Sequence, residues 1–337
     1  MLTGSASPLV SVIVTALDAR TLIKECLIAL LRTDYPRERR EILVVDNGSK
    51  DGTTEIIKQL PVRYLWEGRR GVSYARNRGI EASKGDILAF TDPDCLASGT
   101  WLRELARGFE GEGVGGVAGE IVPYPGKTPA ERYAARRRSH SQVRSMNHPL
   151  RPFAMTPNVA YRREVFQQIG LFDTRFAGGG WEDADLCWRF FSGTRFKLGY
   201  APHAVVFHRY RTTVREYFIQ HVRYGDGLAR IYAKYRGDLA PGWQQSLHGY
   251  WNLGNLTWIL AKEVLSGVNP GDLHTAWFDL IRQVGQRIGF VGGAILGGRL
   301  APDRLAAEYT ALKMETFEAA RSITARSRPD LSQGEVK

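Results

Sequence analysis

The sequence has few cysteines, and they are far apart. Cys26, Cys95 and Cys187 are the only three among 337 residues, and their spacing matches neither a metal-binding motif nor a disulfide framework. This usage is typical of a reducing compartment. No stretch reaches the roughly 18 apolar residues of a membrane-spanning helix, and residues 1–8 lack the basic and apolar regions of a signal peptide. We therefore expect a cytoplasmic protein.

Positive charge, by contrast, is in excess. The formal net charge is +11, while 43% hydrophobic and 24% charged residues are the balance of a soluble globular protein. Many arginines gather in residues 69–78 and 132–144. A basic chain favours polyanions such as nucleotide phosphates, nucleic acid or an anionic membrane surface. No nucleic-acid-binding motif accompanies the charge, so we do not expect nucleic acid as a partner.

Two carboxylates, Asp92 and Asp94, follow a short apolar run that ends at Phe90. Pro93 pushes Asp92 into an extended conformation, in which residues two positions apart point to the same side. Such a pair, at the carboxyl end of a buried strand, can hold a hard divalent cation on the phosphates of a substrate. The alternative is an Asp-Pro turn that only ends the strand.

Strands and helices alternate over the first 122 residues. Apolar runs predict strands over 9–14, 41–45, 62–65, 86–90 and 114–122, and helical spacing predicts helices over 22–31, 53–60, 72–83 and 100–109. This alternation predicts an α/β fold with a mostly parallel sheet flanked by helices. Beyond it we expect a basic helix over 128–143, strands over 158–161, 196–200 and 204–208, and helices over 163–169, 181–191, 214–235, 243–265, 272–297 and 301–325.

Polar residues at expected strand ends and helix starts are further site candidates. Asp46 ends a strand, where it could bind a base or a ribose or belong only to a turn. Arg76 lies at a helix start, where it could meet a phosphate or pair with Asp92 or Asp46. His208 ends a later strand and could be a third metal ligand or a structural histidine.

Three glycines precede an acidic helix start at Glu182 and Asp183. A Gly-rich loop can open and close over a site. A carboxylate behind such a flap can act as a general base. The alternative is that both residues only complement the dipole of the helix start.

In this order, the motifs resemble those of the family 2 inverting glycosyltransferases, which have the GT-A fold. The resemblance covers roughly residues 8–225 and is carried by Val12–Ala16, Val45–Ser49, Gly71–Gly79, Asp92-Pro93-Asp94 and Glu182-Asp183. It implies Mn²⁺ or Mg²⁺ on Asp92, Asp94 and His208, with Asp183 as the catalytic base beside Glu182. The nucleotide-sugar site that we assign with it comprises Thr15, Ala16, Asp18, Asp46, Gly48, Ser49, Gly71, Arg76, Asn77, Asp92, Pro93, Asn158 and Trp181.

The implied reaction moves a sugar from a nucleoside-diphosphate sugar, UDP-linked in the first instance, to a hydroxyl of a glycan or lipid-linked saccharide. A sugar nucleotidyltransferase and a catalytically silent sugar- or partner-binding module are the alternatives. We expect residues 1–225 to form the catalytic GT-A domain and residues 226–337 a helical region. The arginines of 132–144 with Trp243, Trp251, Trp258 and Trp277 suggest that this region docks on the inner face of the cell membrane; packing on the catalytic domain or in a homodimer is the alternative.

Overall fold

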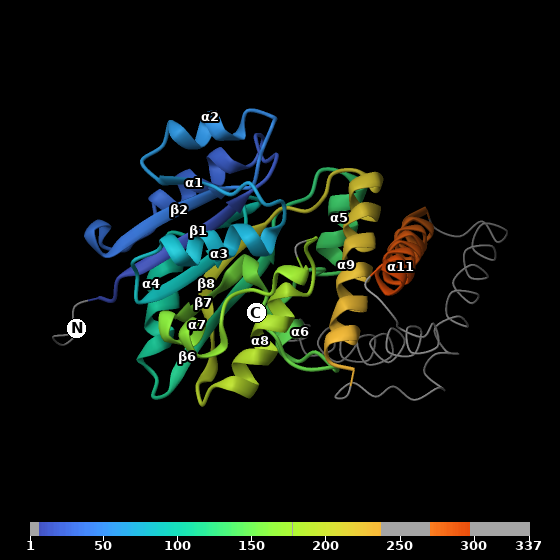
Figure 1. Cartoon of the computed structure of the whole chain (residues 1–337). Helices are drawn as coiled ribbons and strands as arrows, with labels where there is room; N and C mark the ends of the chain where they lie inside the picture. Colours follow the sequence, from blue (N-terminus) through green and yellow to red (C-terminus); the bar gives the residue numbers. More distant parts are fainter. Residues whose placement is uncertain (1–6, 177, 237–269, 297–337) are drawn as a thin grey trace, which may run out of the picture.

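The computed structural model describes residues 7–176, 178–236 and 270–296 (Figure 1). Its strands form one eight-stranded sheet in the order β3-β2-β1-β4-β7-β6-β8-β5. The strands are β1 (Val10–Ala16), β2 (Arg40–Asp46), β3 (Arg63–Trp66), β4 (Ile87–Thr91), β5 (Cys95–Ala97), β6 (Val114–Pro123), β7 (Val159–Arg162) and β8 (Lys197–His208). The α/β class expected from the sequence is therefore confirmed.

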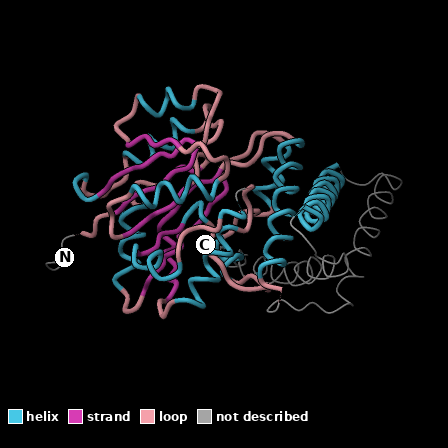
Figure 2. Tube along the Cα trace, in the orientation of Figure 1, coloured by secondary structure: helices cyan, strands magenta, loops and turns pink. Residues whose placement is uncertain are grey.

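Helices cover both faces of the sheet (Figure 2). They are α1 (Ile23–Leu31), α2 (Thr53–Lys58), α3 (Val72–Ala82), α4 (Trp101–Arg107), α5 (Pro129–Arg136), α6 (Gln142–Met146), α7 (Arg163–Ile169), α8 (Glu182–Gly193), α9 (Val214–Lys234) and α11 (Pro270–Leu296). Successive residues of β1 point to opposite faces. Val12 accordingly packs with α1 and α4, while Ile13 packs with residues of α3, α7 and α8. Burial on both faces explains the continuous apolar runs of these strands.

The sheet is parallel in its first half and mixed in its second. β3, β2, β1 and β4 run parallel, but β7 is antiparallel to both β4 and β6. The strands expected over 196–200 and 204–208 are one strand, β8, whose pairing with β6 shifts register between Gly119 and Glu120. Three-residue β5 was not predicted; it pairs antiparallel with the end of β8 and places Cys95 opposite His208.

The single basic helix expected over 128–143 is wrong, because two helices, α5 and α6, occupy this region. Arg138 adopts a positive φ of 44° just after α5, which an α-helix does not accommodate. The Ser141 hydroxyl then accepts a hydrogen bond from the Arg144 N–H and caps α6. The break leaves His140 in a loop, directed at the interior near β8 rather than carried on a helix face.

The helices expected over 214–235 and 272–297 are confirmed as α9 and α11. They lie side by side beyond the sheet (Figure 1). The helices expected over 243–265 and 301–325, with Trp243, Trp251 and Trp258, lie outside the described residues. Among the described helices, none is long and apolar enough to cross a membrane.

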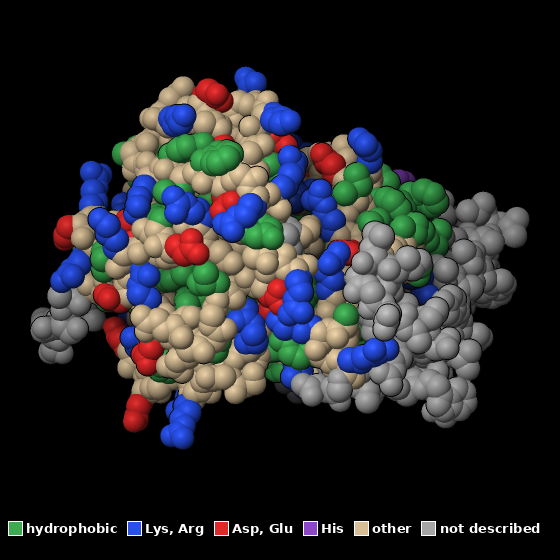
Figure 3. All heavy atoms as spheres, in the orientation of Figure 1, with side chains coloured by type: hydrophobic (Ala, Val, Ile, Leu, Met, Phe, Trp, Pro, Cys, Tyr) green, Lys and Arg blue, Asp and Glu red, His purple; other side chains and the backbone are tan. Residues whose placement is uncertain are grey.

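Hydrophobic side chains gather on the surface over α9 and α11 (Figure 3), and Trp277, Ile288 and Val291 of α11 are exposed. This surface would suit either a membrane or a protein partner. Membrane docking, dimer formation and the division at residue 225 therefore remain predictions.

Glycines allow α9 and α11 to approach closely. A Cβ on Gly289 would lie 1.8 Å from the carbonyl oxygen of Val222, and one on Gly225 would lie 1.9 Å from that of Gln286. Gly292, also in α11, has no heavy atom within 4 Å of the same position. The two helix backbones therefore touch at Gly225 and Gly289 but not at Gly292.

This difference predicts opposite effects for two alanine substitutions in α11. Gly289→Ala should lower the free energy of unfolding by about 1–3 kcal/mol, because the new methyl group forces backbone apart. Gly292→Ala should raise it by up to about 1 kcal/mol, because alanine favours helix without a clash. Urea denaturation of both variants checks this, and equal effects would contradict the close approach.

Candidate active site

The site residues expected from the sequence lie at the carboxyl edge of the sheet. Ala16, Asp46 and His208 are the last residues of β1, β2 and β8, and Asp92 directly follows β4. Ligands of open α/β sheets bind at this edge, where loops and helix starts converge. The parallel run of β1, β2 and β4 is what brings these loops together.

The turns after β1 and β2 are linked by reciprocal hydrogen bonds. The Asp18 N–H donates to the Ser49 hydroxyl at 3.0 Å, and the Lys50 N–H donates to the Asp18 carboxylate at 2.8 Å. These bonds hold Asp18 at a positive φ of 48°. Gly48 has a φ of 85° and open space around it, which leaves its backbone accessible. Thr15 is half-buried nearby.

Asp46 supports its own turn. Its carboxylate accepts hydrogen bonds from the Ser49 N–H at 2.9 Å and from the Thr54 hydroxyl. Although burial opposes them, these bonds hold the pKa of Asp46 below its ordinary value. A contact between Asp46 and a nucleotide base remains a prediction.

Asn47 links β2 to the start of α3. Its amide donates to the carbonyls of Glu67 and Arg69 at 3.0 and 2.8 Å, and its oxygen accepts from the Gly71 N–H at 2.7 Å. Asn77 has a comparable role, exchanging two hydrogen bonds with the backbone of Phe172. The Asn47 amide shapes the loop before Gly71, whereas the Asn77 amide joins α3 to the backbone at Phe172. Neither role is visible in the sequence pattern.

Arg76 connects the two acidic motifs. Its buried guanidinium donates to Glu182 at 2.6 Å and to Asp92 at 3.3 Å. Of the two structural partners weighed from the sequence, Asp92 is present, whereas Asp46 is bonded to its own turn. The contact with Glu182 spans 106 residues and fixes the start of α8 against the end of β4.

Burial changes the acidity of two carboxyl groups in this site, those of Asp183 and Asp92. Burial raises the pKa of Asp183 to about 7, and the neighbouring Glu182 charge adds to this rise. Burial also raises the pKa of Asp92 to about 6, against the opposing effect of Arg76. Asp183 accepts a hydrogen bond from the Ala184 N–H at 2.8 Å and is only partly buried. It can therefore exchange a proton with a bound molecule near neutral pH.

Asp92 and Asp94 have different partners. Asp92 pairs with Arg76, whereas an Asp94 oxygen lies 3.5 Å from His208 Nε2 and its other oxygen lies 3.8 Å from Arg211. Pro93 between them is half-buried. Burial lowers the pKa of His208 to about 3, so its imidazole is neutral, as a metal ligand must be.

The neighbours of His208 could not be anticipated from the sequence. The ring of His140 stacks on that of His208 with centroids 4.2 Å apart, and His140 Nε2 lies 3.1 Å from the Tyr224 hydroxyl of α9. His140 occupies the break between α5 and α6, which no motif marked. The pair links the carboxyl edge of the sheet to the helical region.

Asn158 and Trp181 have different surroundings. Asn158 is fully buried, accepting a hydrogen bond from Trp101 Nε1 and donating to the carbonyls of Glu120 and Ala204. Its amide is fully bonded within the core, and a contact between Asn158 and the nucleotide sugar remains a prediction. Trp181 is partly exposed at a φ of 70°, directly after the glycines and near His148.

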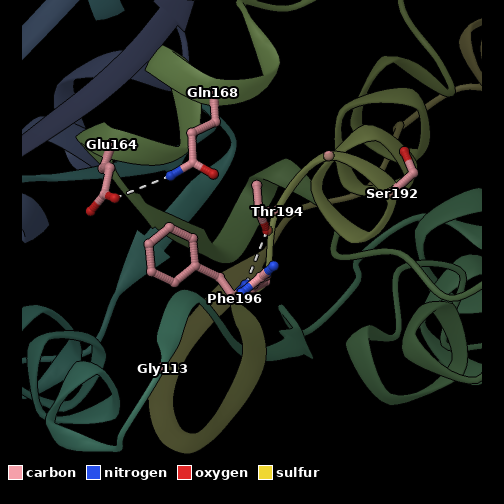
Figure 4. A pocket seen from close by; sticks show the side chains of 8 residues that line it. Gly113, Glu164, Gln168, Ser192, Thr194 and Phe196 are labelled. Atoms are coloured by element: carbon pink, nitrogen blue, oxygen red, sulfur yellow. Dashed lines mark hydrogen bonds between the residues drawn. The ribbon is translucent and has the colours of Figure 1, made fainter.

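The hollow shown in Figure 4 lies at the opposite edge of the sheet. It measures about 610 Å³ and is lined by Gly113, Glu164, Gln168, Ser192, Gly193, Thr194, Arg195 and Phe196. Gly113 and Phe196 immediately precede β6 and β8, so the hollow faces the amino ends of these strands. None of the predicted site residues lines it.

The chain is similar in sequence to known glycosyltransferases. Residues 11–170 match the family model described as Glycosyl transferase family 2. The chain is 39% identical to glycosyltransferase AglE of Haloferax volcanii over 184 residues, which are 52% of this chain and 60% of that protein. It is 31% identical to the pre-mycofactocin glycosyltransferase of Mycobacterium tuberculosis over 178 residues, 51% of this chain and 37% of that protein. The chain thus spans less than two thirds of either relative.

The fold also resembles a solved structure. Mannosyltransferase PcManGT from Pyrobaculum calidifontis has a TM-score of 0.54 and 20% identity, with 96% of this chain and 89% of that chain covered. The likeness confirms the expected GT-A fold. In sequence and in fold, the proteins that this chain resembles are glycosyltransferases. Residues 11–170 are thus similar to glycosyltransferase family 2, the family that the order of the motifs predicted.

The Arg76 contacts predict a pH-dependent stability defect. Arg76→Met should lower the free energy of unfolding by about 3–5 kcal/mol at neutral pH, because it leaves Glu182 and Asp92 buried without their cation. Loss of the cation raises the folded-state pKa of Asp92 further, because Arg76 is what lowers it in the wild-type protein. The defect should therefore be largest above that raised pKa and shrink as the pH falls below about 6, where Asp92 is protonated in the folded wild-type protein as well.

Chemical denaturation at several pH values measures this defect. Arg175→Met is the matched control, because Arg175 is exposed and its pairing with Asp173 should contribute no more than about 1 kcal/mol. A pH-independent defect in Arg76→Met would contradict the electrostatic role.

Proposed function

We propose that this chain is a metal-dependent inverting glycosyltransferase that uses a nucleoside-diphosphate sugar, with UDP as the first nucleotide to test. The observation that carries the proposal is the contact of Arg76 with both Glu182 and Asp92. This contact links Glu182 and Asp183, a carboxylate pair suited to proton transfer, with Asp92 and Asp94, a carboxylate pair suited to cation binding. The PcManGT structure contains GDP-Man and Mn²⁺, which supports a nucleotide sugar and a divalent cation as ligands of this fold.

Asp92, Asp94 and His208 fit a divalent cation. Asp94 and the neutral His208 offer an oxygen and a nitrogen 3.5 Å apart, and Asp92 lies two positions away along the chain. Mn²⁺ accepts such mixed ligands, whereas Mg²⁺ prefers oxygen. A bound cation would neutralise negative charge on the diphosphate leaving group.

Asp183 is the proposed general base. It takes the proton of an acceptor hydroxyl, whose oxygen bonds to the anomeric carbon as the bond from that carbon to the diphosphate breaks. One direct displacement inverts the anomeric configuration. A pKa of about 7 matches this task, since the carboxylate is both available and basic near neutral pH. Such a poised base supports transfer over the silent binding module considered from the sequence.

The acceptor we propose is a hydroxyl of a glycan or lipid-linked saccharide, as expected for an enzyme of polysaccharide biosynthesis. Gly178, Gly179 and Gly180 form the loop before Asp183, and a Cβ on Gly180 would lie 3.0 Å from the Tyr224 ring of α9. This loop thus packs directly against α9, and the acceptor would reach Asp183 beside that contact. The helical region would place it there, in solution or at a membrane surface.

A donor screen tests the proposed donor and cation together. UDP-, GDP-, dTDP- and CDP-sugars should be compared by thermal shift with and without Mn²⁺. One nucleotide should raise the melting temperature, more strongly with Mn²⁺. Asp92→Asn and Asp94→Asn should each abolish transfer and the Mn²⁺-dependent part of the shift while circular dichroism stays unchanged. Transfer at wild-type rates by both variants would refute the metal assignment.

Asp183→Asn should retain donor affinity and lose turnover by a factor of about 10² to 10⁴, the range for a missing general base. In the wild-type enzyme, kcat/KM should fall as the pH drops through about 7, because only ionised Asp183 accepts the proton. Glu182→Gln should be affected more mildly. If the residual kcat/KM of Asp183→Asn still fell as the pH dropped through about 7, another residue would be the base.

A further inference from the structure

Asp94, Cys95 and His208 form a compact group of three different ligand atoms. One carboxylate oxygen, the Cys95 Sγ and one imidazole nitrogen all lie within 4.8 Å of one another. The Asp94 oxygen is 3.5 Å from His208 Nε2 and 3.8 Å from Cys95 Sγ. All three residues are buried. The group therefore has a fixed shape before any ion arrives.

The sheet builds this group. Cys95 begins β5 and lies directly opposite His208 in the antiparallel pair of β5 with β8. Directly opposed residues of two strands project to the same face, with Cβ atoms about 4.5–5.5 Å apart. Asp94 precedes Cys95 in the turn from β4. On the other side of His208, the stacked ring of His140 limits rotation of the imidazole.

The separations suit a tetrahedral cation. With metal bonds of about 2.0–2.1 Å to nitrogen or oxygen and about 2.3 Å to sulfur, adjacent ligand atoms lie about 3.3–3.8 Å apart. The two separations from the Asp94 oxygen, 3.5 and 3.8 Å, are already in this range. Binding would thus require only small side-chain movements.

The sulfur atom decides which cation is favoured. Zn²⁺, Co²⁺ and Cd²⁺ bind thiolates well, whereas Mn²⁺ and Mg²⁺ favour oxygen. We propose that Asp94, Cys95 and His208 form a site for a thiophilic divalent cation of the Zn²⁺ class. Binding releases the thiol proton to solvent and leaves a thiolate–metal bond. Such an ion would compete with Mn²⁺ or Mg²⁺ for Asp94.

When no metal ion is bound, Arg211 supplies the positive charge beside Asp94, Cys95 and His208. Its guanidinium lies 3.8 Å from the second Asp94 oxygen, and its side chain is 41% exposed. Exposure lets it swing toward solvent when a metal ion takes its place. The competition with Mn²⁺ or Mg²⁺ rests on the proposed transferase function, whereas the ion site itself does not.

Cobalt spectroscopy tests the site directly. The metal-free full-length protein is titrated with Co²⁺, and the near-ultraviolet thiolate-to-cobalt charge-transfer absorption is recorded. Wild-type protein should develop this band with one equivalent of Co²⁺. Cys95→Ser and Cys95→Ala should lack it. Circular dichroism checks that the variants are folded.

Cys26→Ser is the matched control. Cys26 is fully buried in the same apolar cluster, and its Sγ lies 3.5 Å from the backbone oxygen of Asp92. It is not part of the three-residue group, so this variant should keep the band. Cys187→Ser should keep it too.

Metal affinities give a second readout. Loss of an outer-shell partner already weakens a metal site about 10- to 100-fold, so loss of the thiolate should weaken Zn²⁺ binding by more than about 10-fold. Mn²⁺ affinity of Cys95→Ser should change less than about threefold, because Mn²⁺ gains little from sulfur. Asp94→Asn should weaken both ions. Equilibrium competition with a metal-sensitive dye measures these affinities.

The outcomes separate the two parts of the proposal. A wild-type protein without the band, or a band retained in folded Cys95→Ser, overturns the site, and the first result needs no variant. Zn²⁺ should also displace Mn²⁺, as followed by the electron paramagnetic resonance of free Mn²⁺. If the band forms and Mn²⁺ stays bound, the competition is overturned. Absence of sugar transfer would refute the proposed function and leave the cobalt result standing.

Discussion

The buried guanidinium of Arg76 is the interaction on which the site depends. Asp92, Glu182 and Asp183 come together where solvent is scarce, and three like charges in such a place repel one another strongly. One cation held between Glu182 and Asp92 reduces that repulsion and fixes the geometry at once. It does not cancel the burial of Asp183, whose pKa stays high. The same arrangement therefore stabilises the fold and leaves one carboxyl able to exchange a proton.

The two halves of the sheet position different residues around the Arg76 guanidinium. The parallel strands β1, β2 and β4 align the loops of Asp18, Asp46 and Asp92, and the first two loops are linked by hydrogen bonds from backbone N–H groups to short polar side chains. The mixed half brings in residues from later in the chain. The pairing of β5 with β8 holds Asp94, the residue before β5, near His208, and α9 reaches this point through Tyr224 and His140.

The sequence predicted what depends on local pattern. The runs of β1, β2 and β4 and the spacing of α1, α3 and α8 are strong enough to be recognised alone, and the order of the acidic motifs indicated the family. What escaped prediction depends on contacts between distant residues. Cys95–Ala97 is too short to show strand periodicity and forms β5 only because β8 pairs with it. The partner of Arg76 lies 106 residues away, and His140 faces His208 only because the helix breaks at Arg138.

The sheet ends in two very short strands. β3 has four residues and β5 has three, so each edge offers few free backbone groups to another chain. Arg63 begins β3, with a side chain that is 44% exposed and charged. Long, flat, apolar edges allow a second molecule to add strands, whereas short and charged edges discourage this. The brevity of β5, which brings Asp94 to His208, thus also protects concentrated protein against edge-to-edge aggregation.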